Sequence, residues 1–176
     1  MTIRKARSWA IFCMAVWLTG TVAMAIVATE NFYRIDHIIG AQSNPVFVSY
    51  IEKLGRDAIH DVMYYYSSEL NRLYFQFWNV IQLVVGVLTL WLVVKVPGSR
   101  RAKWEVVAML GIALFLTILI TPRIVSVGRS LDFVPRVPPP DGLRTFGLLH
   151  ATYTVLDGIQ LILGVLVTLS LVALKD

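Results

Sequence analysis

The sequence predicts an all-α integral membrane protein, a single domain in which four helices cross a bilayer as a bundle. Of its 176 residues, 57% are hydrophobic and 15% charged, whereas about 25% of an ordinary soluble domain is charged. The apolar residues also fall into four long blocks, at residues 8–28, 73–94, 104–121 and 146–174. Each block reaches the roughly 17 to 25 residues that a membrane-spanning helix needs.

The first block, residues 8–28, follows a basic N-terminus and contains small residues at 23–25. A cleaved signal peptide is therefore the alternative to a retained span, and the length of the block favours the span. The single cysteine, Cys13, lies inside this block. No intramolecular disulfide is possible, so cysteine usage does not indicate a compartment.

Orientation follows from the short turn between the second and third blocks. Counted over the whole chain, Lys and Arg divide evenly between the two sides, but residues 95–103 pack four cations between two helix ends without an acid. The positive-inside rule then places both termini in the cytoplasm, and we expect a cell membrane such as a bacterial inner membrane. No recognition motif for nucleic acid accompanies the basic residues, so the expected partner is the lipid bilayer.

The extracytoplasmic side would hold a long segment, residues 30–72, and a shorter loop, residues 122–145. Within the long segment the apolar spacing predicts an amphipathic helix that lies on the membrane surface or caps the bundle. Its apolar residues are Phe47, Tyr50, Ile51, Leu54, Ile59, Val62 and Met63. In the shorter loop, the three prolines at 138–140 favour a stiff, extended connection.

The second and fourth blocks share a short repeat. Residues 82–88 read QLVVGVL and residues 160–166 read QLILGVL, an offset of 78 positions along which polar residues match as well as apolar ones. This predicts two duplicated helical hairpins in the same orientation about an axis normal to the membrane. The first and third blocks show no comparable match.

Helical spacing places the matched polar residues on one stripe of each helix. The stripes consist of Arg72, Gln76, Asn79, Gln82 and Gly86 on the second span, and of His150, Thr154, Asp157, Gln160 and Gly164 on the fourth. Lipid offers no hydrogen bonds, so we expect both stripes to face the bundle interior. For the amides and threonines, hydrogen bonding between helices is the simplest interpretation.

Asp157 is different because it is ionisable. It lies about ten residues into its span, roughly 15 Å at 1.5 Å per residue, where a carboxylate costs about 2.5 to 3.5 kcal/mol. It must be neutral, paired or hydrated. We therefore take the eight polar stripe residues, with Asp157 at their centre and His150 near the extracytoplasmic end, as candidate binding or proton-relay residues.

Other chemistries find little support. Bis-histidine haem ligation at membrane depth is disfavoured because His37 and His60 lie outside the spans. Asp57, His60 and Asp61 share a helical face, yet a specific metal site needs ligands that converge from other segments. No Gly-rich phosphate loop, nucleophile elbow, Cys-x-x-Cys or His-Glu-x-x-His sequence is present. We therefore expect no enzyme activity, no metal and no cofactor.

Short motifs are scattered over most of the chain. Residues 40–50 read GAQSNPVFVSY, the second span carries Asn79, and Pro122 is followed by Arg129. The last span begins with Phe146, Leu149, His150 and Asp157. These motifs resemble the four-helix membrane proteins of unknown function that include transmembrane protein 205 and its bacterial relatives. Pro45 ahead of Phe47, Tyr153 in place of serine and Asp157 in place of asparagine depart from the family pattern.

This resemblance implies a fold and topology more than an activity, with suggested links to transport or to metal and drug tolerance. Two functions are favoured, and a haem, quinone or pigment bound between the second and fourth spans is the least supported third. One is a small transport or proton-coupled permeation module centred on Asp157. The other is an accessory subunit of a larger membrane complex, which docks through its extracytoplasmic segment and the aromatic residues Tyr64, Tyr65, Tyr66, Tyr74, Phe75, Phe77 and Trp78. Self-association through Ala15, Thr19 and Ala23 is a further expectation.

Overall fold

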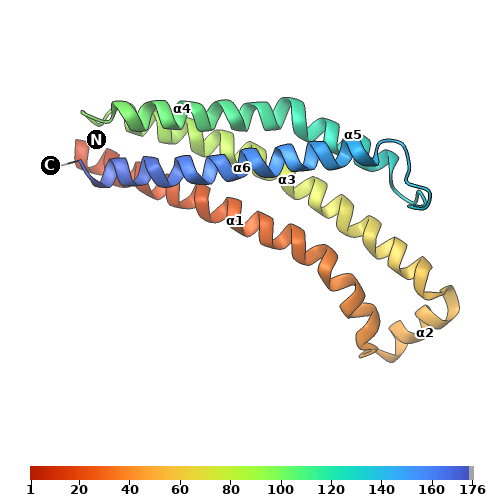
Figure 1. Ribbon diagram of the computed structural model, residues 1–176. Coiled ribbons are helices and arrows are strands. Elements are labelled where there is room, and N and C mark those ends of the chain that lie inside the picture. Colours follow the sequence, from red (N-terminus) through yellow and green to blue (C-terminus); the bar gives the residue numbers. More distant parts are fainter. Residues whose placement is uncertain (175–176) are drawn as a thin grey trace.

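A computed structural model describes residues 1–174 and confirms the all-helical fold, with four helices long and apolar enough to cross a membrane (Figure 1). The elements are α1 (Ile3–Ala41), α2 (Pro45–Leu54), α3 (Arg56–Val94), α4 (Arg100–Phe115), the π-helical turn η1 (Leu116–Ile120), α5 (Thr121–Ser130) and α6 (Leu143–Val172). α4, η1 and α5 form one continuous helix of 31 residues.

The four long helices form a ring in which α1 packs on α3, α3 on α4, α4 on α6, and α6 on α1. Both termini lie at the same end (Figure 1), where Arg7 donates a hydrogen bond to the carbonyl oxygen of Leu174. The core is densest in this half of the bundle. Met14, Val106 and Leu171 come from three different helices and are completely buried there.

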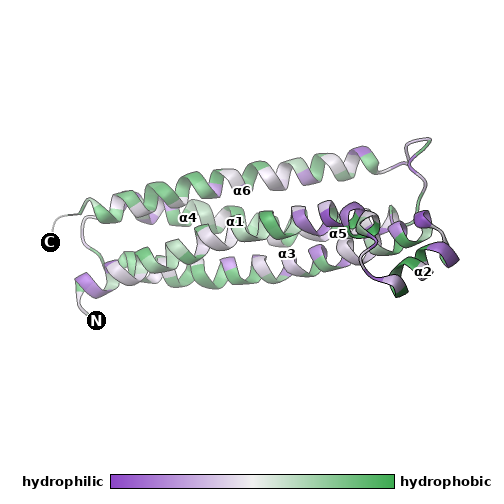
Figure 2. Cartoon of the chain, turned by 90° about the horizontal axis from the view of Figure 1, so that it is seen from below, coloured by the Kyte–Doolittle hydropathy of each residue, from purple (hydrophilic) through white to green (hydrophobic). Residues whose placement is uncertain are grey.

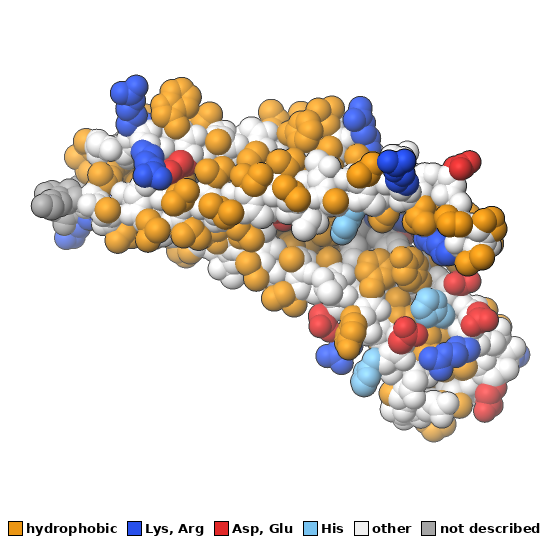
Figure 3. All heavy atoms as spheres, viewed as in Figure 1, with side chains coloured by type: hydrophobic (Ala, Val, Ile, Leu, Met, Phe, Trp, Pro, Cys, Tyr) orange, Lys and Arg blue, Asp and Glu red, His pale blue; other side chains and the backbone are white. Residues whose placement is uncertain are grey.

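The outer surface of the bundle is apolar. Val84, Val87 and Ile162 are each more than 60% exposed, although a soluble protein would bury such residues. The middle of the space-filling view is mostly hydrophobic, and charged side chains gather toward the two ends (Figure 3). The hydropathy colouring likewise places hydrophilic residues near the N-terminus and around α2 (Figure 2). This distribution is the one that a surrounding bilayer selects.

α1 and α3 extend far beyond the predicted spans. Each has 39 residues, about 58 Å of helix, which is nearly twice the roughly 30 Å of a bilayer's hydrocarbon layer. Their outer parts stay together as a paired arm that diverges from α6 and carries α2 at its tip (Figure 1). Asn31 Nδ2 donates to Asn71 Oδ1 at 2.7 Å, and Asn71 Nδ2 donates to the carbonyl oxygen of Ala28 at 2.9 Å.

The amphipathic surface helix expected around residues 47–63 is divided in the structure. Asn44 caps α2 by accepting hydrogen bonds from the backbone N–H groups of Val46 and Phe47, and Pro45 occupies the first turn. The helix ends at Gly55, whose φ of +88° is a conformation that glycine adopts readily. Residues 56–63 then belong to α3. One glycine therefore decides the boundary that the hydrophobic periodicity missed.

The prediction that residues 122–145 form a connecting loop is wrong for its first part. The helix passes through Pro122 and ends at Ser130, which leaves a connection of twelve residues, 131–142. Proline lacks a backbone N–H and crowds the preceding turn. The turn before it is the π-helix Leu116–Ile120, in which the wider hydrogen-bond spacing accommodates the interruption without ending the helix.

Candidate functional site

Asn79 lies at the centre of the bundle, only 1% exposed, and joins three helices. Its Nδ2 donates to Thr121 Oγ1 at 2.7 Å, and its Oδ1 accepts from the hydroxyl group of Tyr153 at 2.8 Å. α3 and α6 are not neighbours in the ring, so the bond from Tyr153 spans the middle of the bundle. The polar stripe of α3 therefore faces the interior at this position, as the sequence predicts.

Gln82, one turn further along α3, is fully buried between two indole rings. Its amide fits best when Oε1 faces the N–H groups of both indole rings. In this orientation Oε1 accepts from Trp78 Nε1 at 2.9 Å and from Trp17 Nε1 at 3.3 Å. This orientation turns the NH₂ group toward acceptors, and the Asp157 carboxyl group interacts with the Gln82 side chain. Gln82 thus links α1, α3 and α6.

Asp157 is half-buried on α6, and the Gln82 amide, in the orientation given above, is the donor with which its carboxyl group interacts. Gln160 lies one turn further and is 1% exposed. Its Nε2 donates to the carbonyl oxygen of Met109 at 2.9 Å, and its Oε1 is buried without a hydrogen-bond partner. The Asp157 carboxyl group and an unpaired amide oxygen therefore lie one turn apart on the same helix.

The remaining stripe residues do not all face inward. Gln76, His150 and Thr154 are exposed, which corrects the expectation that both stripes are wholly internal. For His150 and Thr154 the reason is the separation of α1 from α6 toward the outer end of the bundle (Figure 1), which uncovers the outer part of the α6 stripe. Gln76 lies on α3 and lines an open cavity between α3 and the η1–α5 segment. Thr154 donates only to the backbone carbonyl of His150, and His150 stacks on Phe146.

Arg72 belongs to an ionic cluster just beyond the second predicted span. Its guanidinium group donates to Asp132 Oδ1 and Oδ2, each at 2.8 Å, and to Glu69 Oε1. Arg129 of α5 donates to both Glu69 oxygens at 3.0 and 3.1 Å. These hydrogen bonds from Arg129 and Arg72 lower the pKa of Glu69 to about 2. The cluster fastens α3 to α5 and to the loop that follows.

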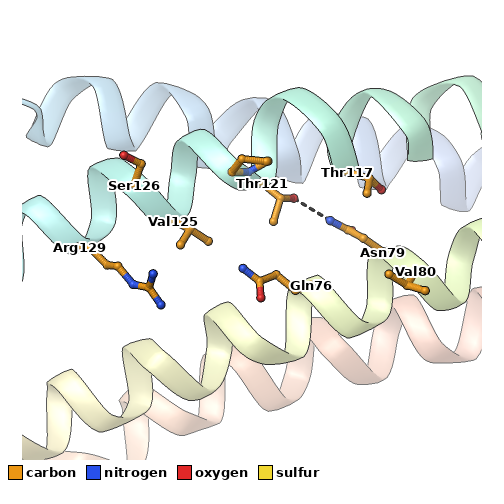
Figure 4. Close-up of a pocket in the computed structure, with 9 residues that line it drawn as sticks. Gln76, Asn79, Val80, Thr117, Thr121, Val125, Ser126 and Arg129 are labelled. Atoms are coloured by element: carbon orange, nitrogen blue, oxygen red, sulfur yellow. Dashed lines mark hydrogen bonds between the residues drawn. The ribbon is translucent and has the colours of Figure 1, made fainter.

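A cavity of about 570 Å³ lies between α3 and the η1–α5 segment (Figure 4). Six of its nine lining residues have polar side chains, although most of the lining surface is apolar, and Asn79 and Thr121 are joined by a hydrogen bond. The lining residues are Gln76, Asn79, Val80, Thr117, Thr121, Pro122, Val125, Ser126 and Arg129. The sequence pattern identified Gln76 and Asn79 but not the cavity residues on the third long helix. The only sign of those residues in the sequence was the polar side chains at positions 117, 121 and 126.

The two hairpins make corresponding contacts. A shift of 78 positions relates α3 to α6 in the sequence. The contacts, and not the sequence, relate α1 to α4 by a shift of 92 positions. The contact of Gln82 with Trp17 corresponds to that of Gln160 with Met109. The contact of Gly86 with Leu110 corresponds to that of Gly164 with Leu18. If one hairpin is placed on the other, each contact therefore falls on its counterpart in the other hairpin. A duplicated hairpin requires this arrangement, and duplication itself stays a prediction.

The aromatic residues from 64 to 78 do not form one surface. Trp78 is buried against Gly20, and Phe75 packs on the ring of Tyr153 with centroids 5.2 Å apart. Tyr66 and Phe77 are 64% and 61% exposed. Within residues 1–174, no group of three or more His, Cys, Asp or Glu side chains is arranged to hold a metal ion.

Comparison with protein-family models, curated proteins and solved structures found no match for the chain. The resemblance to the family of transmembrane protein 205 therefore stays a prediction.

Proposed function

We propose that this membrane protein is a small proton-coupled permeation module in which Asp157 takes up and releases a proton. The observation that carries the proposal is a buried carboxyl group, Asp157, that interacts with the Gln82 amide and lies one turn from Gln160 Oε1, a buried acceptor that lacks a hydrogen-bond donor. An unpaired buried polar group costs about 1 to 3 kcal/mol. Ionisable groups inside a membrane domain are retained mainly where they act.

Protonation of Asp157 would change the balance between hydrogen-bond donors and acceptors. A neutral carboxylic acid carries one O–H donor, whereas a carboxylate only accepts. Asp157 and Gln160 are three residues apart, so their side chains share one helical face. A proton on Asp157 would therefore supply a donor within reach of the Gln160 oxygen, while the Gln82 amide interacts with the same carboxyl group.

A route for the proton is supported by the burial gradient along the polar stripe of α6. His150 and Thr154 are exposed, Asp157 is half-buried, and Gln160 and Gly164 are buried. Beyond them, Val167 and Leu171 are completely buried in the apolar core. Access to Asp157 therefore comes from the outer end in this conformation, and passage to the other side needs a rearrangement of the helices.

Proton uptake into liposomes tests the proposal. Reconstituted protein, driven by a potassium diffusion potential and followed with an internal pH dye, should take up protons faster than protein-free vesicles. Asp157→Asn should reduce the rate to that of empty vesicles. Asp141→Asn is the matched control, because Asp141 is exposed in the loop before α6. Equal rates for wild type and Asp157→Asn, with both proteins folded, would remove Asp157 from the mechanism.

We also propose that both termini are cytoplasmic and that the protein resides in a cell membrane such as a bacterial inner membrane. The termini lie together at one end, and the turn at residues 95–99 is at the same end (Figure 1). That end carries the four cations of residues 95–103. Fusion of alkaline phosphatase to the C-terminus should give no activity in bacteria, whereas fusion within residues 131–142 should give activity.

A second candidate function, an accessory subunit, is favoured by a groove on the arm. This groove lies between α1 and α3, has a volume of about 430 Å³ and carries charged residues among its apolar ones. It is lined by Glu30, Asn31, Arg34, Ile35, Ile38, Val62, Met63, Tyr66, Ser67 and Leu70. A partner subunit would dock there through an apolar segment, outside the predicted spans.

Native mass spectrometry from membranes distinguishes the two functions. An accessory role predicts a complex of fixed composition that Tyr66→Ser weakens and Tyr50→Ser leaves intact, since Tyr50 is exposed on α2 outside the groove. Detection of the chain alone or only as its own oligomer would count against docking at the groove. Ala15, Thr19 and Ala23 are all exposed on α1, so they stay available for self-association.

A further inference from the structure

The cavity between α3 and η1–α5 opens away from the interior of the bundle. In Figure 4 Gln76 and Asn79 of α3 point toward Thr121 and Val125 of the facing helix. Val80 of the lining is 55% exposed. Asn79 precedes the end of α3 at Val94 by fifteen residues, about 22 Å of helix, so this level lies within a hydrocarbon layer of about 30 Å. The cavity therefore faces lipid.

The polar groups of this cavity are not fully used by the protein. Among the described residues, Gln76 makes no side-chain hydrogen bond, and the Thr121 hydroxyl group accepts from Asn79 without donating to any acceptor. Thr117 donates only to the carbonyl oxygen of Ala113, which leaves its oxygen free to accept. Lipid tails satisfy none of these groups. A ligand with its own hydrogen-bonding atoms would.

The charge at the outer rim indicates what kind of ligand fits. Arg129 is the charged residue of the lining, and both Glu69 oxygens accept hydrogen bonds from it. Arg72 is likewise paired with Asp132. The two cations and two anions balance, so an anionic headgroup would gain no unpaired cation. Uncharged amides and hydroxyls make up the polar wall below them.

We infer that this cavity binds an uncharged amphiphile from the bilayer, a neutral lipid whose polar part consists of hydroxyl or carbonyl groups. Such groups match free donors on Gln76 and Thr121 and a free acceptor on Thr117. The hydrocarbon part of the lipid would extend out of the cavity past Val80. The volume of about 570 Å³ is that of a typical small-molecule site. The π-helical turn that widens the adjoining helix is a feature common at binding sites. The inference does not depend on the role of Asp157.

Photolabelling tests this site directly. The folded protein in nanodiscs would be labelled with a monooleoylglycerol that carries a diazirine, and the labelled residues would be mapped by mass spectrometry. We expect labelling concentrated on α3 and α5 around the cavity. Unlabelled monooleoylglycerol should compete, whereas oleyl sulfate, which has the same chain and a permanent negative charge, and octadecene, which has no polar group, should not.

Two variants should weaken this labelling by about three- to tenfold, the loss expected for one neutral hydrogen bond. They are Gln76→Leu, at an exposed position that leaves the core intact, and Thr117→Val. Thr152→Val is the matched control, because the Thr152 hydroxyl group also donates to a backbone carbonyl but lies at an exposed position of α6 outside the cavity. Labelling spread evenly over lipid-facing residues, equal competition by octadecene or oleyl sulfate, or unchanged labelling of Gln76→Leu would each overturn the inference.

Discussion

The hydroxyl group of Tyr153 donates to Asn79 Oδ1 at 2.8 Å and so connects α6 to α3 across the centre of the bundle. Both side chains are buried, and Asn79 in turn donates to Thr121. A single amide therefore connects three of the four long helices.

Tyr153→Phe isolates this bond, because phenylalanine keeps the packing of the ring against Phe75 and removes only the hydroxyl group. We expect the free energy of unfolding to fall by about 0.6 to 1.7 kcal/mol, the range for hydrogen bonds between membrane helices. Denaturation in mixed micelles, followed by circular dichroism, measures the change. Tyr66→Phe, at an exposed tyrosine, should have no effect. Equal stability of the two variants would show that the bond contributes nothing.

Gly20 provides the space in which Trp78 lies. A Cβ atom at position 20 would come within 1.9 Å of Trp78 Cη2, so Gly20→Ala must displace the indole that donates to Gln82. We expect a loss of about 1 to 3 kcal/mol, as for other overpacked cores, and a change in tryptophan fluorescence. Gly111→Ala is the control, because a Cβ atom there meets nothing within 4 Å. A thermal transition equal to that of the wild type would contradict the close contact.

Much of the fold could be predicted from hydropathy, because four apolar blocks separated by charges have few solutions in a bilayer. The offset of 78 positions correctly indicated that Gln82 and Gln160 are both buried. The ends of the helices could not be predicted this way. Hydropathy marks where the chain leaves the hydrocarbon layer, whereas α1 continues to Ala41 because its polar part still pairs with α3.

The contacts of the candidate site were harder to predict for a different reason. Arg72 was identified, but its partner Asp132 lies 60 residues away in a connecting loop, and no periodic pattern relates the two. The exposure of His150 and Thr154 depends on the divergence of two whole helices, which the local sequence of α6 does not encode. Contacts between distant segments therefore could not be predicted from the pattern of any single helix.

The Glu69 cluster should make stability sensitive to acid. The pKa of Glu69 falls from 4.5 to about 2 in the folded state, so its contribution is complete above pH 4.5 and is lost as the pH falls toward 2. We expect the unfolding midpoint of the wild type to decline over this window more steeply than that of Glu69→Gln. Glu52→Gln, on exposed α2, should follow the wild type. Parallel curves for wild type and Glu69→Gln would contradict the cluster's role.

The two central amides should differ in importance although they occupy corresponding positions. Gln82→Leu deprives two buried indole N–H groups and the Asp157 carboxyl group of their partner. At about 1 to 3 kcal/mol for each unpaired buried group, we expect a loss of at least about 2 kcal/mol.

Gln160→Leu removes an oxygen that already lacks a donor and gives up one bond to a backbone carbonyl. A change within about 0.5 kcal/mol is therefore expected, because removal of an unsatisfied group offsets the lost bond. Denaturation of both variants under identical conditions provides the comparison. If Gln160→Leu were as damaging as Gln82→Leu, the Gln160 oxygen would have to be paired in the folded protein, and the argument for a proton on Asp157 would lose its main support.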